Sequence, residues 1–179
     1  MNSSSRDVLD EARLEQLYRK LERPMYNVVY RWLWSSEDAH DVVQEAFAKL
    51  WQMRDRVDMA TAEPLVYRIA INQASNLRRW KRLRSFVRLD NTTELSDADA
   101  ESPEQRDKRA RVRRAIEALP DKLMKVVALC DLAGLSYKEV AAVLDIVEGT
   151  VGSRRNKALA ILRDELGEWE TDGDEAARA

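Results

Sequence analysis

Four polar residues recur at helical spacing near the middle of the chain, in a pattern that could hold a strand of nucleic acid. Asn72, Ser75, Asn76 and Arg79 lie three or four positions apart, so they share one stripe of a predicted helix. Cations bind the phosphates of such a strand, whereas amide side chains read the edges of its bases. A solvated basic end of an ordinary helix would show the same pattern.

The stretch from Leu135 to Leu162 predicts two helices joined by a tight turn. Ser136 and Glu139 have the spacing of a capping box, which starts the first helix. This is the helix-turn-helix plan, whose second helix enters the major groove of DNA. The alternative is a plain helical hairpin with a solvated basic face. The second helix begins near Glu148 and carries the polar residues Ser153, Arg154, Asn156 and Lys157.

A third polar group is acidic and lies on a helix predicted over residues 37–53. One side of this helix is apolar and faces a core, whereas another flank is polar. That flank is either a solvated face or a docking surface for a basic partner. We call it the acidic ridge, and its members are Asp38, Asp41, Gln44 and Glu45.

The composition favours an all-α protein. The 179 residues include only 5 Gly and 4 Pro, and long apolar segments have helical rather than alternating periodicity. The single cysteine, Cys130, excludes an internal disulfide, and with the single histidine, His40, it does not make a His/Cys zinc site. Without a glycine-rich phosphate loop or a catalytic cluster, we expect neither a cofactor nor enzymatic activity. No apolar run approaches the roughly 18 residues of a membrane span, so we expect a cytoplasmic protein.

Charge is segregated along the chain. Basic side chains outnumber acidic ones by 16 to 12 in residues 1–89 and by 12 to 6 in residues 108–163. Acidic side chains outnumber basic ones by 7 to 1 both in residues 90–107 and in residues 164–179. This alternation indicates two modules that bind a polyanion. The predicted division is a first domain over residues 8–88, a flexible acidic linker over 89–107, a second domain over 108–166 and an acidic tail over 167–179.

Periodicity and helix breakers place the elements around these residues. Pro24 interrupts a helix predicted over residues 8–30, so we expect a kink or a second helix there. Ser35 or Ser36 caps the helix that carries the acidic ridge, and Gly134 ends a helix over residues 121–132. The remaining expectations are a loop over residues 54–64, a helix over 65–84, a linker over 86–107 and a helix over 108–119.

In this order, the motifs resemble the group 4, extracytoplasmic-function (ECF) sigma factors of bacteria over about residues 12–166. The family's acidic pattern with Gln-Glu-x-Phe matches residues 38–47, and its Tyr-Arg-Ile-Ala-x-Asn pattern matches residues 67–72. The patterns Gly-Leu-Ser-Tyr-x-Glu and Glu-Gly-Thr-Val-x-Ser-Arg match residues 134–139 and 148–154. Motifs in two separate domains are far more specific than a single helix-turn-helix.

The resemblance implies a non-catalytic subunit that directs RNA polymerase to particular promoters. The acidic ridge would dock on the clamp helices of the polymerase β′ subunit, and the second domain would meet the β flap. An anti-sigma factor or another regulatory protein would control the chain. The −35 element would be read as duplex DNA by Thr150, Ser153, Arg154, Asn156 and Lys157. The melted −10 element, with one base flipped from the stack, would be held by Arg56, Arg68, Asn72, Ser75, Asn76, Arg79, Lys81 and Arg82.

Several residues depart from the family's pattern. His40 replaces an acid, and Leu65 replaces a tryptophan. Val147 stands where a side-chain N-cap is usual, Gly152 where a long side chain is usual, and Arg155 where leucine is usual. A missing N-cap costs about 1 kcal/mol of helix stability. Arg155 falls on the core side of its helix, so it must turn toward solvent or form an ion pair.

Two other functions stay open on the sequence. A stand-alone helix-turn-helix regulator would bind duplex DNA without polymerase, but it leaves the acidic ridge and the stripe at residues 72–79 without a role. A sigma-like adaptor that has lost DNA binding would act by sequestering a partner.

Overall fold

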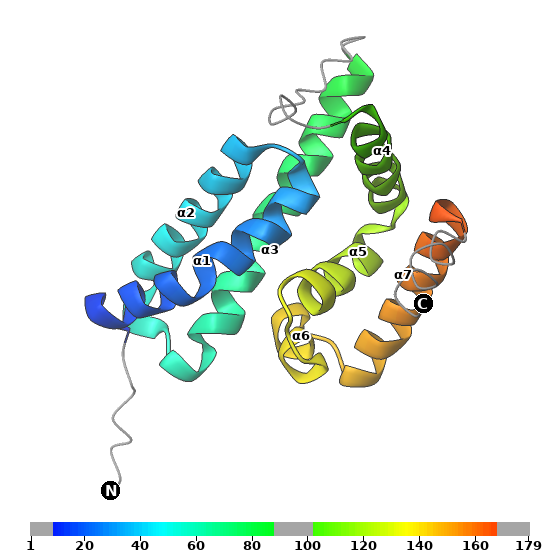
Figure 1. The fold of residues 1–179 in the computed structure, drawn as a ribbon. Helices are drawn as coiled ribbons and strands as arrows, with labels where there is room; N and C mark the ends of the chain where they lie inside the picture. The colour runs from blue at the N-terminus through cyan, green and yellow to red at the C-terminus, as the bar shows by residue number, and fades with distance from the viewer. Residues whose placement is uncertain (1–8, 88–101, 168–179) are drawn as a thin grey trace, which may run out of the picture.

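The computed structural model describes residues 9–87 and 102–167. Within these ranges the chain forms seven α-helices and no β-strand, so the predicted all-α class is confirmed (Figure 1). None of the described helices is long and apolar enough to cross a membrane. Most of the predicted linker and tail lies outside the described residues.

Three long helices pack side by side as the first helical group (Figure 1). They are α1 (Glu11–Leu33), α2 (Ser36–Gln52) and α3 (Met59–Val87). Each turns an apolar stripe toward the others, and their shared core includes Trp32, Leu50 and Tyr67. Ser35 caps α2, as expected, because its hydroxyl accepts a hydrogen bond from the N–H of Asp38. The core thereby fixes the acidic ridge and the polar stripe on the outside of the group.

Helix α1 continues through Pro24, so of the two outcomes expected there, a kink or a second helix, the second helix is wrong. A proline in a helix interior removes one hydrogen bond and costs about 3 kcal/mol. Leu21, Met25 and Val28 flank the proline and are all buried in the core. Packing along this continuous apolar face outweighs the cost of the proline.

The loop predicted over residues 54–64 is wrong for its second half, because α3 already begins at Met59. The connection from α2 is a short 3-10 turn, Arg54–Arg56, followed by two residues. Asp58 starts α3: its carboxylate accepts the N–H of Ala60 at 2.9 Å, and its carbonyl accepts the hydroxyl of Thr61 at 3.0 Å. Pro64 interrupts the pattern that follows, which is why periodicity alone places the start at residue 65.

The second helical group begins with α4 (Pro103–Ala118), so the linker expectation is wrong for residues 103–107. Ser102 and Gln105 form a capping box, and Pro103 occupies the first helical position. These start signals lie inside an acidic, Ser-rich stretch whose composition favours a linker. The local capping chemistry nevertheless determines the helix.

The predicted helix-turn-helix is confirmed in the rest of the second group. Ser136 and Glu139 form the expected capping box, and their hydrogen bonds lower the pKa of the Glu139 carboxyl. Gly134 ends the preceding turn at φ 71°, and Asp145 makes the tight turn before the last helix at φ 55°. The elements are α5 (Asp121–Val127), a π-helical turn (Ala128–Leu132), α6 (Tyr137–Leu144) and α7 (Glu148–Leu166).

The two groups contact each other through arginines of α3. The guanidinium of Arg68 donates hydrogen bonds to the carbonyl oxygens of Ala142 at 2.6 Å and Val143 at 2.8 Å, in the last turn of α6. Arg78 is only 7% exposed and donates to the carbonyl of Glu117, in the last turn of α4, at 3.0 Å. Carbonyls at a helix C-terminus carry partial negative charge. The arginines of α3 therefore cap two helices of the second group.

Candidate nucleic-acid interface

The polar stripe predicted on α3 is present but shorter than expected. Asn72, Asn76 and Arg79 are exposed. Ser75 is only 4% exposed, and its hydroxyl has no hydrogen-bond partner among the described residues. The expectation that Ser75 shares the exposed stripe is therefore wrong. Ser75 lies one helical turn from the buried Ile71, at the edge of the stripe, and the packing that covers Ile71 extends over it.

The basic end of α3 carries an exposed aromatic ring. Trp80 is 51% exposed, and the guanidinium carbon of Arg84 lies 4.3 Å from its ring centroid. Lys81 pairs with Asp38 on α2, and Arg82 donates to a carbonyl oxygen of α4 at 2.9 Å. This end combines cations with a stacking surface, the two features that bind an unpaired strand.

The other two arginines predicted for the unpaired strand lie at different places. Arg56 is exposed in the short turn before α3. Its neighbour Arg54 stacks on Trp51, with 4.6 Å between the guanidinium carbon and the ring centroid. Arg68 is also on the surface, but its guanidinium is occupied by the carbonyls of α6.

The acidic ridge on α2 is exposed along most of its length. Asp41, Gln44 and Glu45 all face solvent on one flank of the helix. Glu45 pairs with Lys49 one turn later at 2.7 Å, which is an exposed contact of small energetic value. Three members of the ridge are thus accessible to a partner.

Asp38 differs from the rest of the ridge because it is partly buried against Lys81. Burial opposes ionisation, but the hydrogen bonds from Lys81 and Ser35 outweigh burial and lower the pKa of Asp38. His40 is exposed on the same helix, and its ring lies 4.5 Å from the ring of Tyr26. The histidine therefore packs on a neighbour of the core rather than within it.

The polar residues predicted on α7 fall in its first three turns, the part that reaches a groove in helix-turn-helix proteins. Ser153, Asn156 and Lys157 are exposed, whereas Thr150 and Arg154 are half-buried. The hydroxyl of Ser153 donates to the carbonyl of Thr150 at 3.1 Å. The structure thus brings all five residues to one end of one helix.

The departures in the helix-turn-helix have structural accounts. Val147 is 72% exposed and makes no side-chain cap, as expected. Gly152 lies under the ring of Tyr137 on α6, where an added Cβ would sit 3.4 Å from the ring. Arg155 forms an ion pair, one of the two expected outcomes, and donates to the carboxylate of Asp131 at 3.1 Å. That hydrogen bond raises the pKa of Arg155.

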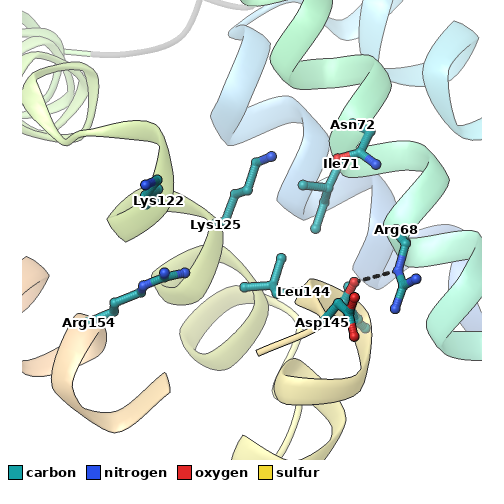
Figure 2. Close-up of a pocket in the computed structure, with 9 residues that line it drawn as sticks. Arg68, Ile71, Asn72, Lys122, Lys125, Leu144, Asp145 and Arg154 are labelled. Atoms are coloured by element: carbon teal, nitrogen blue, oxygen red, sulfur yellow. Dashed lines mark hydrogen bonds between the residues drawn. The ribbon is translucent and has the colours of Figure 1, made fainter. Parts of the chain in front are cut away.

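A cavity of about 370 Å³ lies where α3 meets the second group (Figure 2). Arg68 and Asn72 line it from α3, and Arg154 lines it from α7. Residues predicted to contact two different DNA elements therefore share one cavity. Lys122 and Lys125 of α5 complete the basic lining, and sequence reasoning missed both. The only available signal was the basic excess of residues 108–163.

Family comparisons match both helical groups. Residues 17–84 match sigma-70 region 2, and residues 109–162 match sigma-70 region 4. The first match contains the acidic ridge and the polar stripe, and the second contains the helix-turn-helix.

Two curated relatives align with most of the chain. The ECF RNA polymerase sigma factor SigE of Mycolicibacterium smegmatis is 31% identical over 170 residues, which cover 91% of this chain and 65% of that protein. The chain thus spans just under two thirds of the length of this relative. The ECF RNA polymerase sigma-E factor of Escherichia coli K12 is 34% identical over 166 residues, covering 81% of this chain and 82% of that protein.

Two solved structures share the fold. CnrH, in complex with the cytosolic domain of CnrY, has a TM-score of 0.68 at 23% identity and covers 88% of this chain and 89% of its own. The sigma factor RpoE from Bartonella quintana, in complex with the anti-sigma factor NepR, has a TM-score of 0.63 at 22% identity and covers 85% and 94%. With both regions matched and the E. coli relative covered over most of its length, this chain belongs to the ECF family of RNA polymerase sigma factors.

Proposed function

We propose that this chain is an alternative sigma factor that binds core RNA polymerase and directs initiation at particular promoters. One observation carries the proposal: two faces suited to nucleic acid lie on separate helical groups, and an exposed acidic ridge lies on the first. The α3 face suits an unpaired strand, and the start of α7 suits duplex DNA. A stand-alone regulator would need only α7, so the two other surfaces favour the sigma factor.

The α3 face would hold the melted −10 element. The amides of Asn72 and Asn76 can hydrogen-bond to base edges, and Arg79 can bind a phosphate. Trp80 beside them offers a ring on which an unpaired base can stack. Arg56 in the preceding turn extends this basic surface.

The remaining two surfaces would contact the −35 element and the polymerase. The first turns of α7, with Asn156 and Lys157 exposed, would enter the major groove. The exposed acids Asp41 and Glu45 would dock on basic residues of the β′ clamp helices. The second helical group would meet the β flap.

The contacts between the groups bear on how promoter DNA is admitted. Arg68 and Arg82 donate to backbone carbonyls of the second group, so part of each guanidinium is already engaged in this arrangement. Contact of DNA with the full guanidinium of either arginine would therefore require the two groups to separate. Core polymerase would favour separation if it binds the separated arrangement more tightly, because a ligand shifts an equilibrium by its differential affinity.

Regulation by a protein partner is a further part of the proposal. One solved neighbour, RpoE, is in complex with an anti-sigma factor. By this likeness, an anti-sigma factor would bind the present chain and compete with core polymerase. Gel filtration of the chain with a candidate partner, with and without core polymerase, would show such competition as displacement of one by the other.

Run-off transcription with core polymerase on a genomic library tests the central proposal. The chain together with core should yield discrete transcripts that core alone does not, and the two should elute together in gel filtration. Binding to duplex DNA without association with core would favour the stand-alone regulator. Association with core without any transcript would favour the sequestering adaptor.

A further inference from the structure

The cavity between α3 and the second group has a strongly basic lining. Of its nine lining residues four are basic and one, Asp145, is acidic. Figure 2 shows Lys122, Lys125 and Arg154 on one side of the cavity and Asp145 toward Arg68 on the other. The apolar side chains of the lining belong to Ile71, Val143 and Leu144.

Three of the four cations have no counter-ion within the described ranges. Neither a hydrogen bond nor an ion pair is made by the side chains of Lys122, Lys125 and Arg154 in those ranges. Arg68 is different, because carbonyls of α6 already occupy its guanidinium. Three unpaired positive charges therefore line one cavity, and a multivalent anion bound there would offset them.

The size and chemistry of the cavity select the class of anion. A volume of about 370 Å³ lies within the range of small-ligand sites. Lysines bind phosphate as point charges, and arginine binds it through a planar fork of donors. A short chain of phosphates carries several negative charges and can pair with more than one cation, whereas a single carboxylate carries only one charge.

We propose that this cavity binds a small polyphosphate anion, either inorganic or carried by a nucleoside, and that binding holds the two helical groups together. The site exists only while the groups are in contact, because Arg68 and Asn72 come from α3 and Lys122, Lys125 and Arg154 come from the second group. Binding there does not rest on the promoter function. The consequence of binding does rest on the proposed promoter function, because a bound anion would keep Asn72 and Arg154 from contacting DNA.

Isothermal titration of the full chain with inorganic tripolyphosphate and with adenosine triphosphate tests the site. We expect one bound anion per chain, and Lys122→Ala, which removes an exposed lysine, should weaken binding by about tenfold. Arg68→Ala should also weaken it, because the cavity needs both groups. The matched control is Lys138→Ala, which removes the same charge from an exposed residue of α6 that does not line the cavity.

The results distinguish an inorganic polyphosphate from a nucleoside polyphosphate, and some of them would overturn the proposal. Equal affinity for both probes would show that the site recognises the phosphate chain alone. Tighter binding of the nucleotide would show that its nucleoside also contacts the apolar part of the lining. Several equivalent sites, or equal losses for Lys122→Ala and Lys138→Ala, would overturn the proposal in favour of general attraction to a basic surface. Small-angle scattering should show a smaller radius of gyration with tripolyphosphate, and an unchanged radius would overturn the coupling between the groups.

Discussion

Asn76 and Ser75 are neighbours in the chain, but only the amide of Asn76 faces solvent. If α3 holds the melted strand, Asn76→Ala removes a base contact and should slow open-complex formation by about tenfold, the value of one good hydrogen bond. Permanganate reactivity of −10 thymines measures strand opening, and binding to −35 duplex should be unchanged. Ser75→Ala is the matched control, and a defect of equal size there would mean that the buried face meets DNA.

The structural role of a residue could be predicted from the sequence where the interacting residues are close together in the chain. The Ser136–Glu139 capping box needs residues three apart, and it is present as predicted. Arg155 was expected to pair or turn outward, but its partner Asp131 lies 24 residues away, and sequence spacing does not reveal a contact across two helices. Lys122 joins the cavity for a similar reason, because only the packing of α5 near α3 brings it there.

At the scale of the element, the start of α7 is under-stabilised. Val147 occupies the N-cap with extended backbone angles, but it has no side-chain acceptor for the first N–H groups, and it is 72% exposed. Val147→Ser supplies the missing acceptor. Because the valine side chain is mostly exposed, its removal loses little buried apolar surface, and the substitution should stabilise the helix by about 1 kcal/mol. Urea unfolding followed by circular dichroism measures this gain. Val147→Ala controls for loss of the valine, and an equal gain there would exclude capping as the cause.

The second prediction at the scale of the element concerns the exposed acidic ridge on α2. Asp41→Arg combined with Glu45→Arg reverses the charge of the surface proposed to meet the clamp helices, so core binding should fall at least about tenfold. Because both side chains are exposed, the helical content should not change. Asp164→Arg with Glu165→Arg makes the same charge change at the exposed end of α7. Core affinity that is unaffected by the first pair would remove the ridge from the docking surface.

The starts of α3 and α4 show where element boundaries escape sequence reasoning. Asp58 and Ser102 are both local caps, so the physical cause lies within a few residues. The surrounding composition nevertheless points the other way, to a loop before Pro64 and to an acidic linker before residue 108. Capping chemistry outweighs composition at both places, whereas the long apolar stripes of α1 and α2 carry a signal strong enough to locate those helices.

At the scale of the whole molecule, the two helical groups contact each other near the surfaces that are proposed to bind separate promoter elements. The arginines of α3 bind helix ends of the second group, and the cavity between the groups holds residues proposed for both promoter elements. The sequence predicted two groups from charge and motifs, but it carried no sign of this contact, because an interface between distant segments leaves no periodicity. The contact is therefore a property of the folded chain, and under the proposed function it would restrict when DNA can bind.

Arg78 provides the test of that contact. It is 7% exposed and binds the carbonyl of Glu117 at 3.0 Å and the carboxylate of Asp121 at 3.5 Å. Arg78→Met fills similar space but removes the hydrogen bonds to Glu117 and Asp121, although Arg82 still donates to the Glu117 carbonyl. Losing hydrogen bonds from a charged group costs about 1–3 kcal/mol and favours separation of the groups. Small-angle scattering should show a larger radius of gyration, and duplex binding in the absence of core should rise.

Arg79→Met is the matched control for scattering, because it removes the same charge one residue later from an exposed side chain. Its radius of gyration should equal that of the unaltered chain, since Arg79 is exposed on α3 and makes no hydrogen bond or ion pair with the second group in the described residues. Equal radii for Arg78→Met and Arg79→Met would show that Arg78 does not hold the groups together. Expansion in Arg78→Met without any gain in duplex binding would show instead that the contact forms but does not restrict access to DNA.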